Sequence, residues 1–219
     1  MRPLLKFCGN HSEADLRVTS QSSADYIGFV FAKSKRQVTP EQVKAWLDRL
    51  ERKPTQRLVA VFVNASVAEI VETVETIPIS VIQLHGTESP EVALRIKRAT
   101  SRSIWKVIHH HDNALQVMKT YEGIVDGYVV DCKVGNEWGG TGTSFDWRFV
   151  PAYLEEGKRQ GLPVFIAGGI NPENVGRLLR YRPDGIDISS GIECDGRKSV
   201  ARIQQLEERM NDDVNECSR

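Results

Sequence analysis

The 219-residue chain lacks several features that would assign it to a broad class at once. Lys+Arg and Asp+Glu are both 29, so a surface of one sign that binds nucleic acid or anionic membranes is not expected. No apolar run is long enough to cross a bilayer, and the opening residues, MRPLLKFCGN, lack the pattern of a secretory signal. Four scattered cysteines form no CxxC pair, which favours a location in the reducing cytoplasm.

The chain does contain a regular alternation of β-branched runs and helical patterns. Eight short runs rich in Val, Ile, Leu and Phe suit strands that are buried on both faces of a parallel sheet. These runs span residues 4–8, 25–31, 58–63, 80–84, 103–108, 127–131, 163–168 and 185–189. No linker or low-complexity tract interrupts them, so we expect one domain over residues 1–219 with a tail that frays from about residue 211.

Three of the segments between these runs share a helix-capping pattern, TPEQ, SPEV and NPEN. Thr39, Ser89 and Asn171 each offer a side-chain oxygen to a free backbone N–H, and a proline follows each of them. Strands and helices in strict alternation predict right-handed parallel crossovers. Eight such units predict an α/β fold, a single (β/α)8 TIM barrel with outer helices; an open doubly wound sheet is the alternative.

Glycine-rich turns follow the last two predicted strands, in IAGGINPEN and DISSGIE. Backbone amides left uncovered beside the start of a helix bind phosphate, and turns after the final two strands match the usual phosphate site of such a barrel. The alternative is that these glycines only make tight turns. The residues predicted to bind phosphate are Gly168, Gly169, Ser190 and Gly191.

A long polar loop, CKVGNEWGGTGTSFDW, follows the sixth predicted strand. Loops of this length are usually functional lids or disordered. As a functional loop, it is predicted to add a third wall to the phosphate site through Gly140, Thr141 and Gly142. Phe145 and Trp147 are expected to pack in the core and anchor the next helix.

Proton-transfer groups are expected at the ends of strands 1 and 6, where the active sites of such barrels lie. Cys8 can act as a base if a cation stabilises its thiolate, although a cysteine is often only a small buried hydrophobe. Asp131 in a pocket of low polarity can stay protonated and act as an acid. In the basic loop after strand 2, Arg36 suits a substrate carboxylate, whereas Lys33 and Lys35 suit a solvated surface.

Several histidines and one further carboxyl group also lie in or after the predicted strands. His85 ends strand 4 and Asp187 lies in strand 8, so we predict that they support the site by lining the pocket or bonding a loop. The run HHH at 109–111 follows strand 5. Three adjacent side chains do not easily share one ion, and no Cys or acidic ligand pattern accompanies them, so no metal site is predicted.

Seven motifs in order resemble the phosphoribosylanthranilate isomerase family of tryptophan biosynthesis: KFCGN, GFVFAKSKRQVTPEQ, VAVFVN, IQLHGTESPE, VVDCKVGNEWGGTGTSFDW, FIAGGINPENV and GIDISSGIE. The resemblance covers nearly the whole chain. It implies a cofactor-free Amadori rearrangement of N-(5-phosphoribosyl)anthranilate to 1-(2-carboxyphenylamino)-1-deoxyribulose 5-phosphate.

The resemblance also implies roles for single residues. Asp131 would protonate the furanose ring oxygen, Cys8 would remove the proton from C2 of the sugar, and Arg36 would hold the anthranilate carboxylate. The glycine turns would hold the phosphate of this small-molecule partner, and the protein would be a monomer or homodimer.

Two other functions remain open from the sequence. One is another phosphate-binding barrel enzyme, such as an indole-glycerol-phosphate synthase or an epimerase; Lys6 and Lys106, within strands 1 and 5, keep the synthase possible. The other is a sugar-phosphate binding barrel without activity, against which the presence of Cys8, Asp131 and Arg36 together argues.

Overall fold

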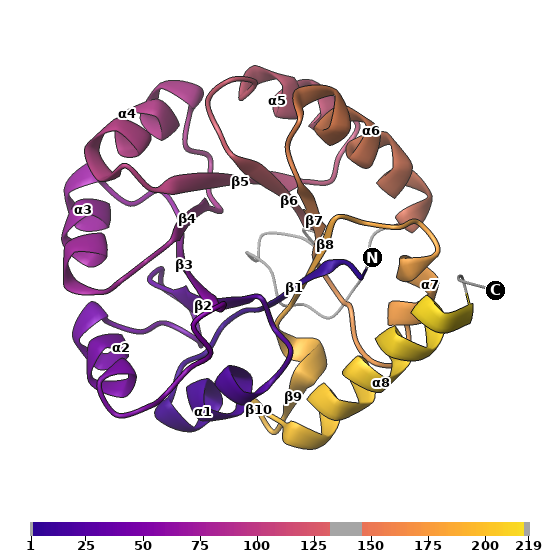
Figure 1. Cartoon of the computed structure of the whole chain (residues 1–219). Coiled ribbons are helices and arrows are strands. Elements are labelled where there is room, and N and C mark those ends of the chain that lie inside the picture. Colours follow the sequence, from indigo (N-terminus) through magenta and orange to yellow (C-terminus); the bar gives the residue numbers. More distant parts are fainter. Residues whose placement is uncertain (1, 132–145, 217–219) are drawn as a thin grey trace.

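The computed structural model describes residues 2–131 and 146–216, which fold into a closed barrel of eight parallel strands (Figure 1). Each strand pairs with the next, and β8 closes the barrel on β1, so the predicted TIM barrel is confirmed and the open sheet is wrong. The strands are β1 Leu4–Phe7, β2 Tyr26–Val30, β3 Arg57–Phe62, β4 Val81–Leu84, β5 Ser103–His109, β6 Gly127–Asp131, β7 Val164–Ile166 and β8 Gly185–Ile188.

Helices surround the barrel and cover the outer face of its strands (Figure 1). The α-helices are α1 Glu13–Gln21, α2 Pro40–Leu47, α3 Val67–Thr76, α4 Pro90–Thr100, α5 Ala114–Thr120, α6 Val150–Gln160, α7 Val175–Leu179 and α8 Val200–Glu216. Two short 3-10 helices, η1 Trp147–Phe149 and η2 Ser190–Ile192, and a small hairpin of β9 Glu193–Cys194 and β10 Arg197–Lys198 complete the described fold. The expected fraying of the tail stays a prediction.

Two of the three predicted helix starts are confirmed. Thr39 accepts a hydrogen bond from the Gln42 backbone N, and Ser89 accepts one from the Val92 backbone N. The predicted cap at Asn171 is wrong, because α7 begins only at Val175. The Asn171 side chain does accept from the backbone N of residues 173 and 174, as predicted, but these N–H groups belong to a turn that precedes α7.

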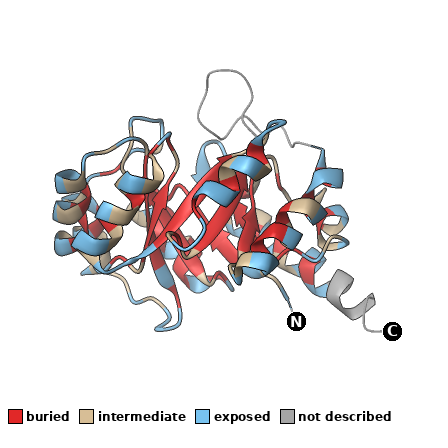
Figure 2. Cartoon of the chain, turned by 90° about the horizontal axis from the view of Figure 1, so that it is seen from above, coloured by how far each residue is buried: buried red, intermediate tan, exposed pale blue. Residues whose placement is uncertain are grey.

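Apolar side chains form two cores, one between strands and helices and one inside the barrel. The barrel strands are mostly coloured as buried in Figure 2. Because successive side chains of a strand point to opposite faces, every second residue faces the interior. Tyr26, Trp105 and Phe165 fill one end of the interior, with ring centroids 4.5–5.6 Å apart. Gly127 and Gly185 make room for them, since a Cβ at either position would approach the Trp105 or Phe165 ring to within 3 Å.

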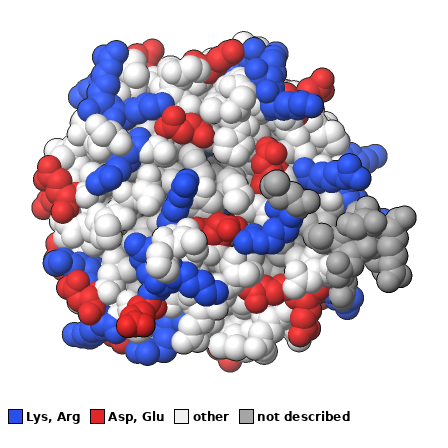
Figure 3. Space-filling model, viewed as in Figure 1, with Lys and Arg blue, Asp and Glu red and all other residues white. Residues whose placement is uncertain are grey.

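The other end of the barrel interior is lined by smaller side chains, among them Cys8 and Ala167. Trp147 is buried, which confirms its predicted core role, whereas Phe145 lies outside the described residues. Lys, Arg, Asp and Glu side chains are interspersed over the face in Figure 3, with no surface of one sign there. Among the described residues, no helix combines the length and hydrophobicity that crossing a membrane requires.

Candidate active site

A cavity of about 540 Å³ opens at the carboxyl ends of the strands, above the aromatic end of the barrel interior. This volume suits a ligand of the size of a small metabolite. The strand ends that line the cavity contribute Cys8, Gln83, His85, Asp131, Ala167 and Asp187.

Cys8 follows β1 and is held at the cavity floor by its backbone, whose N–H donates to Ile188 O at 2.8 Å. Its side chain faces Gly28 of β2, where an added Cβ would lie 2.9 Å from the thiol sulfur. Burial raises the pKa of the Cys8 thiol, while the positive charge of Lys6 opposes that rise. The thiol is therefore confined and poorly solvated, and the positive charge of Lys6 stabilises its thiolate form.

Lys6 and Asp187 form a buried ion pair beneath Cys8, with Lys6 Nζ 2.6 Å from Asp187 Oδ2. The pair results from strand register, since β1 and β8 place these two residues side by side and both point inward. The second carboxylate oxygen, Asp187 Oδ1, is buried without a hydrogen-bond partner within the described structure. Asp187 lines the cavity, and this oxygen can accept a hydrogen bond from a hydroxyl or N–H group that reaches it.

Asp131 ends β6 and reaches the cavity from a different side than Cys8. Its side chain is buried, and its Oδ2 lies 3.4 Å from His85 Nε2. His85 Nδ1 in turn lies 3.4 Å from the amide nitrogen of Gln83. Asp131, His85 and Gln83 thus form a row of polar side chains that connects the ends of β4 and β6.

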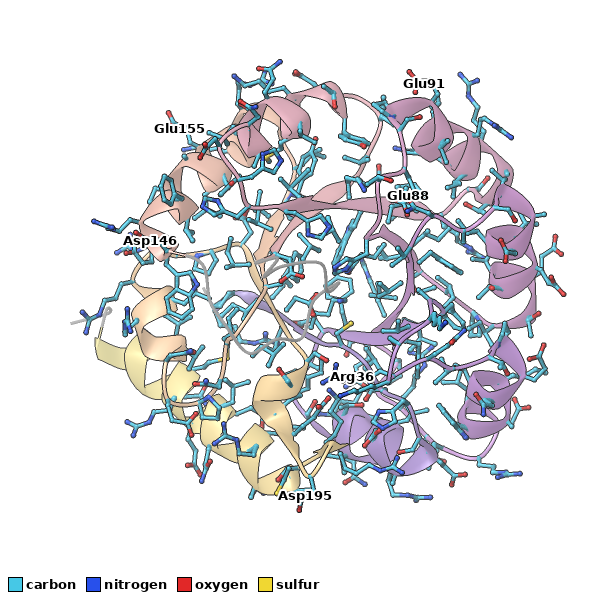
Figure 4. All side chains as sticks on the ribbon, turned by 180° about the vertical axis from the view of Figure 1, so that it is seen from behind. Arg36, Glu88, Glu91, Asp146, Glu155 and Asp195 are labelled. Carbon is cyan, nitrogen blue, oxygen red and sulfur yellow. The ribbon has the colours of Figure 1, made fainter. Side chains whose placement is uncertain are left out.

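Arg36, in the loop after β2, lies inside the ring of helices, whereas Asp195 at the tip of the β9–β10 hairpin lies at its outer edge (Figure 4). Arg36 Nε and Nη2 donate to Glu193 Oε1 and Oε2 at 2.9 and 2.7 Å. Lys198 Nζ, which is buried, donates to Glu193 Oε1 at 2.8 Å. Burial raises the pKa of Glu193, but the bonds from Arg36 and the charge of Lys198 outweigh it and lower that pKa overall.

The Arg36–Glu193 pair occupies only part of the guanidinium group. Within the described residues, Nη1 and one further N–H of Nη2 have no hydrogen-bond partner, and the excess positive charge of Arg36 and Lys198 over Glu193 favours an anion. Arg36 lines the cavity, so this donor edge lies where a ligand carboxylate can reach it.

The turns after β7 and β8 form the remaining wall. Gly168 and Gly169 have φ values of 89° and 66°, a region that residues with a Cβ rarely adopt. Both glycines and Ser190 line the cavity. Gly191 is not among the lining residues; a Cβ there would lie 1.8 Å from Ile170 O, so this glycine lets the two turns pack directly on each other.

Comparison with known proteins gives a consistent result. A family model described as N-(5'phosphoribosyl)anthranilate (PRA) isomerase matches residues 5–209. The chain belongs to this isomerase family. N-(5'-phosphoribosyl)anthranilate isomerase of Geobacillus thermodenitrificans is 58% identical over 94% of this chain and 92% of its own length. The protein of the same name from Bacillus subtilis is 44% identical over 96% of each chain.

Solved structures of the family have the same fold. Phosphoribosyl anthranilate isomerase from Thermotoga maritima matches with a TM-score of 0.82 and 27% identity, over 96% of this chain and 99% of that one. A structure of the isomerase in complex with reduced 1-(o-carboxyphenylamino)-1-deoxyribulose 5-phosphate matches with a TM-score of 0.80 and 26% identity, over the same shares of the two chains.

The structure brings most of the predicted site residues of this family member to one cavity. The predicted residues that line it are Cys8, Arg36, His85, Asp131, Gly168, Gly169, Asp187 and Ser190. Gly140, Thr141 and Gly142 lie outside the described residues. Lys33 also lines the cavity, although the sequence favoured a solvated position.

Glu193 and Lys198 were missed, because no local pattern indicates that a hairpin after η2 turns back onto the loop after β2. Gln83 and the pairing of Lys6 were also missed, yet strand alternation carries a signal for both. Gln83 lies two residues before His85, and Lys6 lies two before Cys8, so each shares the inward face of its strand.

The three consecutive histidines have different hydrogen-bond partners. His109 Nε2 lies 3.0 Å from His85 O, and His110 Nδ1 lies 2.8 Å from the Tyr153 hydroxyl. His111 Nδ1 accepts from the Asn113 backbone N. His109 continues the inward face of β5, two residues after Val107.

Proposed function

We propose that this family member catalyses the Amadori rearrangement of N-(5-phosphoribosyl)anthranilate to 1-(2-carboxyphenylamino)-1-deoxyribulose 5-phosphate in tryptophan biosynthesis, without a cofactor. The observation that supports it most is that the buried Cys8 thiol, after β1, and the buried Asp131 carboxyl group, at the end of β6, line one cavity. Arg36, whose guanidinium group is only partly used by its ion pair with Glu193, lines the same cavity. A steady-state assay with N-(5-phosphoribosyl)anthranilate tests the activity directly. We also expect a cytoplasmic protein, either a monomer or a homodimer.

In the proposed reaction, Asp131 gives its proton to the furanose ring oxygen while the C1–O bond breaks, which leaves a C1=N iminium and an open-chain sugar. The Cys8 thiolate then takes the proton from C2, and the C2–H electron pair forms the C1=C2 bond of an enolamine. Movement of the C2 hydroxyl proton to C1 yields the ketone. The thiol of Cys8 and the carboxylate of Asp131 exchange one proton through solvent to restore the starting forms.

The buried pair beneath the thiol fits this scheme. Removal of a proton from carbon requires the thiolate, and the ammonium group of Lys6 favours that charged form over the thiol. Asp187, which neutralises Lys6, keeps one oxygen without a hydrogen-bond partner among the described residues. We propose that this oxygen accepts a hydrogen bond from a sugar hydroxyl.

In Asp131→Asn, which has no proton to lose at position 131, the residual activity is expected to rise with pH if Cys8 is the base. Its pKa is raised mainly by burial, so only a fraction of the enzyme carries the thiolate at neutral pH, and that fraction grows up to tenfold for each pH unit below the pKa. The value of kcat/KM of Asp131→Asn should therefore increase between about pH 6 and pH 8. A profile that is flat or falls over this range would contradict the assignment of Cys8.

For the phosphate, we propose the turns after β7 and β8. Gly168 and Gly169 present backbone N–H groups without a Cβ in the way, and Ser190 adds a hydroxyl at the cavity wall. The predicted contributions of Gly191 and of residues 140–142 stay predictions.

Arg36 is proposed to bind the anthranilate carboxylate with the edge that Glu193 leaves open, and Glu193 is a positioning residue that acts through it. Arg36→Met should raise KM by about tenfold or more with a small change in kcat, because it removes a charge-assisted hydrogen bond made in both ground and transition states. Glu193→Gln should raise KM less, since the amide still accepts one bond from the guanidinium but no longer fixes it as a fork.

The matched control is the substrate itself without its carboxylate, N-(5-phosphoribosyl)aniline. If Arg36 and Glu193 serve the carboxylate, neither substitution should change kcat/KM for this analogue. Equal losses with both substrates would mean that the pair supports the fold or the sugar site instead.

A further inference from the structure

We propose that His85, His109 and Asp131 form a binding site for Zn²⁺ or a similar divalent transition-metal ion, and that the bound ion inhibits the enzyme. Two imidazoles and one carboxylate with an open position are a common ligand set for such ions. Inhibition rests on the proposed function, because the ion would hold the carboxyl group that the reaction requires as an acid. The metal-binding part of the inference does not depend on it.

The three ligands come from neighbouring strand ends. Strand register places His109 of β5 directly beside Asp131 of β6, and both lie on the inward face of the barrel. His85 follows the adjacent β4, and its ring centroid is 5.3 Å from that of His109. The closed barrel therefore brings the three side chains together without any contribution from the helices.

The distances are close to those of a bound state. One ligand atom of each residue lies within 4.8 Å of the others, and His85 Nε2 is 3.4 Å from Asp131 Oδ2. Two atoms that bind one tetrahedral Zn²⁺ at about 2.1 Å lie roughly 3.4 Å apart. The His85–Asp131 separation already has this value, and a ligand atom of His109 lies within 4.8 Å of both.

Each imidazole ring has a hydrogen bond that favours the neutral form in which one ring nitrogen keeps its lone pair for a metal ion. His109 Nε2 lies 3.0 Å from His85 O, a bond that places the ring proton on Nε2 and the lone pair on Nδ1. The Gln83 amide nitrogen lies 3.4 Å from His85 Nδ1, while Gln83 Oε1 has no hydrogen-bond partner within the described structure. Exchanging the amide N and O gives Oε1 a partner in the His85 Nδ1–H and leaves the Nε2 lone pair toward Asp131.

The surroundings leave room for the ion and its remaining ligands. His85 and Asp131 line the cavity, so water can complete the coordination. The nearby ammonium of Lys106 is already bound by Glu88 at 2.9 Å and by the carbonyl of residue 86 at 2.7 Å. The bound ion would occupy the Asp131 carboxylate and part of the substrate volume, which predicts inhibition competitive with substrate.

The experiment uses the full chain and two metal probes. Co²⁺ titration should give the visible absorption bands of a cobalt ion with nitrogen and oxygen ligands, and Zn²⁺ should abolish them. In a steady-state assay, Zn²⁺ should raise the apparent KM for N-(5-phosphoribosyl)anthranilate, and a chelator should reverse the effect. His109→Gln should weaken Zn²⁺ inhibition by about tenfold or more while the rate without metal stays unchanged, because a ligand is lost but no reacting group.

His110→Gln is the matched control, since His110 is adjacent in sequence but bonds Tyr153, and it should keep wild-type inhibition. The site would be overturned if the wild type gave no cobalt bands. It would also be overturned if Zn²⁺ inhibited His109→Gln as strongly as the wild type, because the ion would then bind elsewhere, such as on the Cys8 thiol. Cobalt bands in a wild type that lacks isomerase activity would support the site and overturn the proposed function. The two proposals therefore fail separately.

Discussion

Asp131→Asn and Cys8→Ser are each expected to lower kcat by at least about a hundredfold, the usual scale for a positioned general acid or base. Asparagine has the shape of the carboxyl group but no acidic proton, so the ring oxygen would have to leave without protonation. Serine keeps a hydroxyl in place of the thiol, but its much higher pKa leaves almost no anion to remove the C2 proton. Both substitutions nearly conserve volume, so the barrel should fold as before.

The measurement is steady-state turnover of N-(5-phosphoribosyl)anthranilate by each variant, with thermal unfolding to verify the fold. Cys194→Ser is the control, because Cys194 is exposed on the β9–β10 hairpin and should not affect activity. A substrate deuterated at C2 separates the two roles: Cys8→Ser should make C2–H cleavage limit the rate and reveal a primary isotope effect. Wild-type turnover in either Cys8→Ser or Asp131→Asn would remove the role assigned to that residue.

The barrel could be predicted from the sequence because its signals are local. Each strand is a short apolar run buried on both faces, and the caps at Thr39 and Ser89 require only residues within the next turn. Asn171 shows the limit of local reasoning. The same side chain that caps a helix also closes a turn, and at Asn171 it closes a turn before α7 begins at Val175.

The site was predicted only in part, because its residues meet through closure of the barrel and through long-range pairing. Cys8, Asp131 and Arg36 lie at strand ends, where the fold alone predicts chemistry. Glu193 reaches Arg36 across 157 positions of sequence, a contact that no spacing pattern contains. His109 is different: its distance of two residues from Val107 predicts an inward side chain once the strand is known.

Gly191→Ala is expected to destabilise the protein by about 3 kcal/mol and to lower Tm by roughly 6–12 °C. The new Cβ would lie 1.8 Å from Ile170 O and 3.0 Å from Asn171 Cα, and both are backbone atoms that cannot rotate away. The turn after β7 must therefore shift. Because that turn carries the Gly168 and Gly169 amides, KM for the phosphorylated substrate should rise as well.

Gly161→Ala is the matched control for this substitution. Gly161 has a φ of 71° at the end of α6, and an added Cβ would meet no atom within 4 Å. The control therefore costs only the left-handed backbone strain of about 1–2 kcal/mol and should leave KM unchanged. Equal Tm losses in the two variants, or an unchanged KM in Gly191→Ala, would contradict close packing of the turns. A larger Tm loss with a raised KM would instead support an indirect role, in which Gly191 lets the turn after β7 take the position that phosphate binding requires.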